Sequence, residues 1–178
     1  MTFLQSDLTY PAVATVCAVA GSVFDVKSRR VPNFITGPAF LLGLSMHAAH
    51  GGWRELLSSL AAGLICGFVF LVFYLAGGMG AGDVKLIVAV GCIAGLPHVP
   101  YLLVLTAISG GVMAVGLALV RGRLRQTVKN VAVLASHHKH LGLQPHAELN
   151  ISNAQTLRLP YALAIASGTI LTLYLQAI

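Results

Sequence analysis

Two carboxylates stand where apolar segments of this chain meet polar ones. Asp83 follows a glycine-rich run, Gly77-Gly78-Met79-Gly80-Ala81-Gly82, and Asp25 stands next to the end of the first apolar segment. Only five Asp and Glu occur among the 178 residues. Because an unpaired carboxylate is costly to bury, acids at a membrane border are candidates for a functional site. Two such acids suggest a catalytic pair.

A pair of neighbouring carboxylates has a specific chemistry. The two groups cannot both ionise easily, so they share a proton and supply one acid and one base. The ionised group accepts a proton from water while the protonated group polarises a peptide carbonyl, which is the division of labour in aspartic proteolysis. This chemistry requires no metal ion, no cofactor and no nucleophilic side chain.

The glycines before Asp83 are the second element of this hypothesis. Gly78, Gly80 and Gly82 lack a Cβ atom, so an extended peptide could approach the carboxylate closely. Irregular backbone at membrane depth needs protein or water as a hydrogen-bonding partner, so we expect this run to line a wet pocket. Close packing of helices is the alternative use of such glycines, but it does not explain Asp83.

Composition predicts the elements that must position these residues. Hydrophobic residues make up 57% of the chain and charged residues 9%, which is typical of an integral membrane protein. The apolar segments cover residues 8–24, 34–49, 56–76, 84–96, 101–120 and 159–178. A spanning helix needs about 20 residues, so the short fourth segment is expected to be a central helix shielded by its neighbours. We predict an all-α, polytopic membrane helix bundle with about six transmembrane helices, forming a single domain over 1–178.

The distribution of the charges predicts the topology. The net charge is +6. If the N-terminus is outside the cytoplasm and all six segments cross the membrane, every Lys and Arg except Arg54 falls in a cytoplasmic connection. This asymmetry follows the positive-inside rule, so basicity indicates contact with lipid and no nucleic acid partner. Both termini are then outside the cytoplasm, and Asp25 and Asp83 lie on the cytoplasmic side.

The long connection 121–158 has its own pattern. Its basic residues recur at helical spacing, and an apolar set recurs on a neighbouring face: Arg121, Arg125 and Lys129, then Leu124, Val128, Val131 and Ala135. This predicts a basic amphipathic helix on the cytoplasmic leaflet, with the docking of a partner as the alternative. Irregular structure is expected from residue 136 onwards. Four histidines stand there without regularly spaced Cys or acidic ligands, so no metal site is predicted: His137, His138, His140 and His146.

Two stretches of the sequence resemble the signature regions of the prepilin peptidases, membrane aspartic peptidases with a GxGD motif. One is Asp25 followed by Val31-Pro32-Asn33, and the other is Gly80-Ala81-Gly82-Asp83-Val84-Lys85-Leu86 followed by Gly91. Leu159-Pro160-Tyr161-Ala162 with Gly168 resembles the start of the last helix of that family. The resemblance therefore extends over nearly the whole chain.

This resemblance implies a site and a function. Asp25 and Asp83 would be the catalytic pair, and six residues would form the active-site loop that binds substrate: Gly78, Gly80, Gly82, Lys85, Pro32 and Asn33. The chain would be an aspartic endopeptidase of the bacterial inner membrane, multi-pass, with periplasmic termini. It would remove the short basic leader of prepilin or pseudopilin substrates at the cytoplasmic face, usually after a glycine, and its other partners would be membrane lipids.

The sequence also departs from part of that family. Larger members carry paired C-x-x-C motifs and N-methylate the new terminus, whereas Cys17, Cys66 and Cys92 are widely spaced here. The small size resembles the branch that serves Flp-type (tight-adherence) pili, so the expectation is restricted to leader cleavage. Two other functions remain open: a proton-coupled transporter, whose acids should lie near the bilayer midplane, and a catalytically silent pilus-assembly scaffold.

Overall fold

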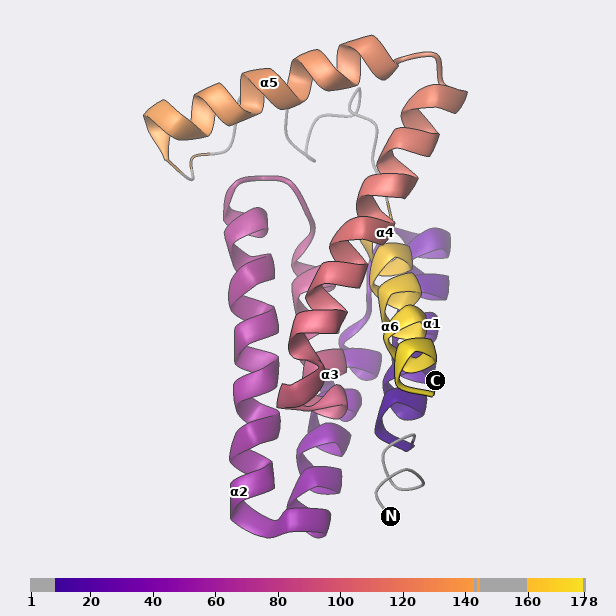
Figure 1. The fold of residues 1–178 in the computed structure, drawn as a ribbon, viewed down its shortest axis with the longest axis vertical. Coiled ribbons are helices and arrows are strands. Elements are labelled where there is room, and N and C mark those ends of the chain that lie inside the picture. Colours follow the sequence, from indigo (N-terminus) through magenta and orange to yellow (C-terminus); the bar gives the residue numbers. More distant parts are fainter. Residues whose placement is uncertain (1–8, 143, 145–159, 178) are drawn as a thin grey trace.

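A computed structural model describes residues 9–142, 144 and 160–177 of the chain, and its regular structure there is entirely helical. The elements are α1 (Thr9–Ser28), α2 (Asn33–Leu75), α3 (Ala81–Ala94), the short 3₁₀ helix η1 (Leu96–His98), α4 (Val99–Val120), α5 (Leu124–Leu141) and α6 (Tyr161–Ala177). Five of the α-helices form a bundle, and α5 lies across one end of it (Figure 1). The all-α prediction is therefore confirmed.

Helix α2 is a hairpin of two arms. Gly52 has non-helical backbone angles, φ 64° and ψ −147°, and the chain reverses direction there (Figure 1). A positive φ is easily adopted by glycine, which has no Cβ to clash. The two arms correspond to the separate segments 34–49 and 56–76 that hydropathy indicated.

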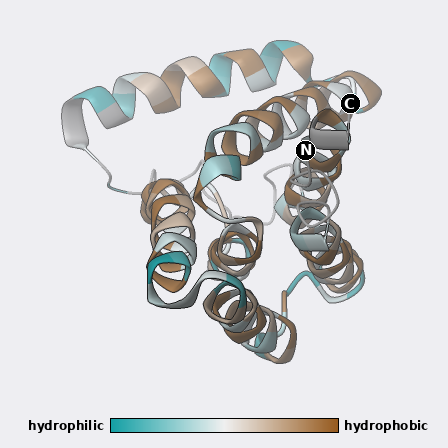
Figure 2. Ribbon diagram, turned by 60° about the horizontal axis from the view of Figure 1, so that its bottom comes forward, coloured by the Kyte–Doolittle hydropathy of each residue, from teal (hydrophilic) through white to brown (hydrophobic). Residues whose placement is uncertain are grey.

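Three helical stretches within the described residues are long and apolar enough to cross a membrane: Thr9–Ser28, Asn33–Leu75 and Leu96–Val120. Tyr161–Leu175 is apolar but shorter. Apolar residues also cover much of the outside of the bundle, as expected of a surface that faces lipid (Figure 2). The membrane bundle is thus confirmed as a class, while the direction in which the chain crosses a membrane stays a prediction.

Helix α3 forms the centre of the bundle, as expected for the short fourth segment. Leu86, Ile87 and Val90 are fully buried, and so are Ala89 and Cys92 on other sides of the helix, so most of its circumference is covered beyond Lys85. Small residues in the arms of α2 allow this close approach: a Cβ atom on Gly43 would lie 2.8 Å from the backbone nitrogen of Ile93. Such contacts through small residues are typical of helix packing in membranes.

Helix α6 lies beside α1 and α4 (Figure 1). It approaches α4 closely at Gly168, where an added Cβ would lie 2.6 Å from Cα of Thr106. Helix α6 also contacts α3. This arrangement brings the N-terminus of α6 to the end of the bundle where α1 ends and α3 begins.

Helix α5 confirms the amphipathic helix but corrects its bounds. Gly122 has a positive φ of 62° and α5 begins at Leu124, so Arg121 caps α4 and does not belong to the amphipathic helix. The helix continues to Leu141. The expectation of irregular structure from residue 136 is therefore wrong for residues 136–141. Residues 143 and 145–159 of the predicted loop lie outside the described part of the chain.

Candidate active site

The glycine run forms a tight connection between α2 and α3. The N–H of Gly78 donates to the carbonyl of Phe73 (2.9 Å), the N–H of Gly77 donates to that of Tyr74 (3.0 Å), and Gly77 has a φ of 77°. These two bonds with a left-handed residue are a Schellman motif, which ends a helix and satisfies its last carbonyls. Helix α3 then starts at Ala81, so Asp83 lies in its first turn.

Asp83 is held at the N-terminus of α3 with only 8% of its surface exposed. Its Oδ2 accepts a hydrogen bond from the backbone N–H of Gly80 at 3.1 Å, which fixes the orientation of the carboxylate. Its Oδ1 is buried and has no hydrogen-bond partner among the described residues. A buried oxygen without a partner is costly, so a water molecule or a substrate group would be stabilised there.

Asp25 reaches the same place from α1. It lies in the last turns of that helix, half-buried, and its carboxylate accepts a hydrogen bond from the backbone N–H of Ala162 at the start of α6. The carboxylates of Asp25 and Asp83 are close enough for their charges to interact. The structure therefore brings together the two acids that stand 58 residues apart in the sequence (83 − 25), at the meeting point of α1, α3 and α6.

Tyr161 is a further member of this site, and the sequence analysis did not name it as a site residue. It is the first residue of α6, it packs against the hydrophobic core, and it is close enough to Asp83 to interact electrostatically. The segment that contains it was singled out by its resemblance. Nothing in the sequence indicates which of its side chains faces the acids, because that depends on how α6 packs against α3.

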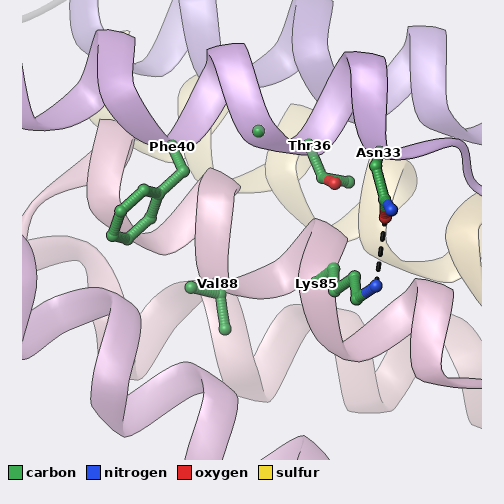
Figure 3. Close-up of a pocket in the computed structure, with 6 residues that line it drawn as sticks. Asn33, Thr36, Phe40, Lys85 and Val88 are labelled. Atoms are coloured by element: carbon green, nitrogen blue, oxygen red, sulfur yellow. Dashed lines mark hydrogen bonds between the residues drawn. The ribbon is translucent and has the colours of Figure 1, made fainter.

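Lys85 and Asn33 meet on another side of α3. The Nζ of Lys85 donates to Oδ1 of Asn33 at 3.0 Å, and this bond joins the first turns of α3 and α2 (Figure 3). Asn is a common capping residue, but the N-cap residue of α2 is Pro32 and no side chain caps this helix end. The side chain of Asn33 instead accepts the hydrogen bond from Lys85. The sequence around Asn33 could not reveal this partner, because Lys85 is on another helix.

A cavity of about 260 Å³ lies beside this contact, between α2 and α3. Six residues of α2 and α3 line it, five of them labelled in Figure 3: Asn33, Thr36, Gly37, Phe40, Lys85 and Val88. Its walls are apolar and its polar groups are at one end. Lys85 stands two residues after Asp83, and residues at this spacing point to different sides of a helix. The cavity is therefore a neighbour of the carboxylate pair and lies on another face of α3.

The three predicted loop glycines have different surroundings. A Cβ on Gly82 would lie 3.2 Å from the backbone nitrogen of Val31 and 3.3 Å from its Cβ. A Cβ on Gly80 would meet nothing closer than Oδ2 of Asp83 at 3.4 Å. A Cβ on Gly78 would lie 3.3 Å from the carbonyl oxygen of Phe73. Gly82 therefore packs against the connection between α1 and α2, and Gly80 is the least restricted of the three.

Candidate metal ligands are scattered in the described part of the chain. No three His, Cys, Asp or Glu side chains there come together in a way that could hold a metal ion. The Nε2 of His137 lies 2.9 Å from the carbonyl oxygen of Gln144, and His146 is outside the described residues. The groups that the site offers for chemistry are the carboxylates, the Tyr161 hydroxyl and backbone N–H groups.

Comparison with known proteins identifies a family. The profile of the type IV leader peptidase family matches residues 12–115, which include Asp25 and Asp83. A prepilin leader peptidase/N-methyltransferase of Vibrio cholerae serotype O1 is 34% identical over 92 residues. This match covers 48% of the chain and 36% of the relative, so the chain matches only about a third of that protein's length. No solved structure matches the chain. Because the family profile covers more than half of the 178 residues, the chain belongs to the type IV leader peptidase family.

Proposed function

We propose that this chain is an aspartic endopeptidase that removes the leader peptide of prepilin or pseudopilin substrates at the cytoplasmic face of the bacterial inner membrane. The observation that carries the proposal is the convergence of Asp25 and Asp83 from two helices, with Oδ1 of Asp83 buried and without a partner among the described residues. The family supports the class of substrate. The charge bias of the connections supports the cytoplasmic face.

The chemistry follows from a shared proton on the carboxylate pair. The ionised carboxylate accepts a proton from a water molecule, and the resulting hydroxide oxygen bonds to the carbonyl carbon of the scissile peptide. The protonated carboxyl group donates its proton to the carbonyl oxygen, which gives a tetrahedral diol. As the diol collapses, the carboxyl group that took the proton of water donates it to the amine nitrogen, the other carboxylate accepts a proton from a diol hydroxyl, and the C–N bond breaks. Each cycle therefore consumes one water molecule and returns the pair to its starting state.

The residues around the pair have roles in the same proposal. An extended substrate would pass Gly80, beside Oδ2 of Asp83, where an added Cβ would meet nothing closer than 3.4 Å. The cavity beside Lys85 and Asn33 would accept an apolar side chain of that substrate. The ammonium group of Lys85 would then be near the backbone carbonyl groups of the substrate. One residue of extended chain spans about 3.3 Å, so a side chain a few residues from the scissile bond reaches the far face of α3.

The test is leader removal by the full chain together with a prepilin of the same genome. Asp25→Asn and Asp83→Asn keep the shape of each side chain but remove its ability to transfer a proton, so each should abolish cleavage, with a loss of at least about 100-fold. Glu55→Gln is the matched control, since Glu55 is an exposed acid near the turn of the α2 hairpin. Near wild-type processing by either Asn variant, at equal membrane level, would disprove the carboxylate-pair mechanism.

The same variants separate the alternative functions. A scaffold without catalysis would support pilus assembly with Asn at positions 25 and 83. A proton-coupled transporter would move protons in vesicles without any prepilin. Its acids should lie near the middle of the membrane, whereas here both acids are at helix ends. Asp25 is three residues before the end of α1, and Asp83 is the third residue of α3. This placement favours the peptidase. The N-methyltransferase activity in the name of the Vibrio cholerae relative is not part of the proposal.

A further inference from the structure

The charge of α5 and its preceding turn is entirely of one sign. Residues 121–141 contain five Lys and Arg and no Asp or Glu: Arg121, Arg123, Arg125, Lys129 and Lys139. Arg121 and Arg123 stand before the helix, Arg125 and Lys129 lie in its first two turns, and Lys139 is near its other end, so positive charge occurs at both ends, most of it at the start. Such a distribution favours an extended negative surface over a single small anion.

Four apolar residues of α5 form one continuous stripe. Leu124, Val128, Val131 and Ala135 stand at i, i+4, i+7 and i+11, which places them on one face at about 100° per residue. Leu124 is 37% exposed, Val128 62% and Val131 61%. Val128 and Val131 are therefore largely uncovered, while Leu124 is partly covered, and the contacts of α5 with the bundle are with α4.

The orientation of α5 fits a membrane surface. The helix lies crosswise to α4 at one end of the bundle (Figure 1). Because α4 is part of a candidate membrane span, a helix crosswise to it runs parallel to the bilayer plane. Hydrophobic and hydrophilic residues alternate along α5 in Figure 2, in contrast to the predominantly hydrophobic helices of the bundle.

We propose that α5 is an in-plane membrane helix that binds anionic phospholipid. Leu124, Val128 and Val131 lie among the upper acyl chains, and Arg125 and Lys129 extend to the headgroup phosphates, as long basic side chains do at an interface. Helix α5 is at the end of the bundle where α1 ends and α3 begins, so the contact sets the depth of Asp25 and Asp83 relative to the headgroups. The inference is independent of the peptidase chemistry.

The experiment measures the surroundings of α5 in the full-length protein. A spin label is placed at Val128→Cys, and at Gln126→Cys as the matched control, since residue 126 is exposed and two residues from Leu124, on the opposite face. Cys17, Cys66 and Cys92 are buried, and wild-type protein labelled in parallel gives their background. Each protein is placed in nanodiscs of phosphatidylcholine with or without phosphatidylglycerol, and collision with oxygen and with a water-soluble nickel chelate is recorded.

In discs with phosphatidylglycerol, the label at 128 should collide at least about threefold less with the nickel chelate than the label at 126, and more with oxygen. The difference should shrink without phosphatidylglycerol and in an Arg125→Gln, Lys129→Gln double variant. Three results would overturn the proposal. The first is equal exposure of both labels to the chelate, and the second is protection at 128 that does not depend on phosphatidylglycerol or on the two basic residues. The third is dipolar broadening between labels, which would show that a second copy covers the stripe.

Discussion

The two oxygens of Asp83 have different surroundings, and this difference defines the site at the scale of single residues. Oδ2 is bound by the N–H of Gly80, whereas Oδ1 is buried without a partner among the described residues. Asp25 is oriented by the N–H of Ala162 in a similar way. Backbone donors thus hold both acids, and backbone donors are positioned by the helices and do not rotate away. The reactive geometry is therefore rigid on the protein side.

Tyr161→Phe is the residue-scale test of the newly found member of the site. The substitution keeps the ring that packs on the core and removes the hydroxyl group near Asp83. We expect kcat for leader cleavage to fall about tenfold with little change in KM, which corresponds to about 1.4 kcal/mol. Tyr174→Phe is the control on the same helix, because Tyr174 is 62% exposed. Equal kcat values for the two variants would remove Tyr161 from the site.

Gly82 and Gly80 should respond differently to the same substitutions. A side chain at position 82 must displace Val31, whose backbone nitrogen would lie 3.2 Å from the new Cβ, while position 80 has more room. We expect Gly80→Ala to keep most activity, Gly82→Ala to lose part of it, and Gly82→Val to lose nearly all of it. Leader cleavage is scored against the membrane level of each variant. If Gly82→Val cleaves as well as Gly80→Ala, the contact with Val31 does not matter.

At the scale of elements, the site depends on how closely three helices approach one another. Helix α3 supplies Asp83, α1 supplies Asp25, and the first turn of α6 supplies Tyr161 and the N–H of Ala162. Helix α6 is held against α4 through Gly168, well away from the acids along the helix. The packing of α4 against α6 therefore positions one side of the site.

Gly168→Ala tests this arrangement. Its Cβ would lie 2.6 Å from the backbone nitrogen and Cα of Thr106, so a helix must shift, at a cost of about 1–3 kcal/mol. We expect a lower midpoint of thermal unfolding in detergent together with a lower rate of cleavage. The control is Gly116→Ala in α4, because nothing lies within 4 Å of that site. An unchanged midpoint for Gly168→Ala would show that α4 and α6 separate easily.

For the whole molecule, the distribution of charge predicts its orientation in the membrane. Lys27→Cys should be labelled from the cytoplasm, and Arg54→Cys should be labelled from the periplasm. Lys27 is in the last turn of α1, just before the first arm of α2, and Arg54 follows the turn at the other end of that arm. Labelling of intact cells with a membrane-impermeant maleimide provides the measurement. Reaction of position 27 but not position 54 in intact cells would invert the topology and place the acids on the wrong face for leader removal.

Local pattern was enough to predict several features of this protein. Hydropathy indicated both arms of α2 and the short central α3, because burial in a membrane bundle selects apolar residues along each segment independently of its neighbours. The repeat of apolar and basic residues indicated α5. Asp25 and Asp83 could be paired from the sequence because acids are rare in the chain and both stand at segment ends. The motif also carries the resemblance that the family profile confirms.

Only the tertiary structure decided which distant residues touch. Lys85 and Asn33 are in contact although they are 52 residues apart in the sequence. Val31, in the connection between α1 and α2, lies next to Gly82 of α3, and Tyr161 approaches Asp83 from α6. Local rules consider only the neighbours within one turn, so they favour a capping role for Asn33 and cannot reveal its bond to Lys85. These contacts depend on the rotation and the spacing of packed helices, which many side chains determine together. The sequence by itself therefore identified the acids, and the packing of α1, α3 and α6 determined the surroundings of those acids.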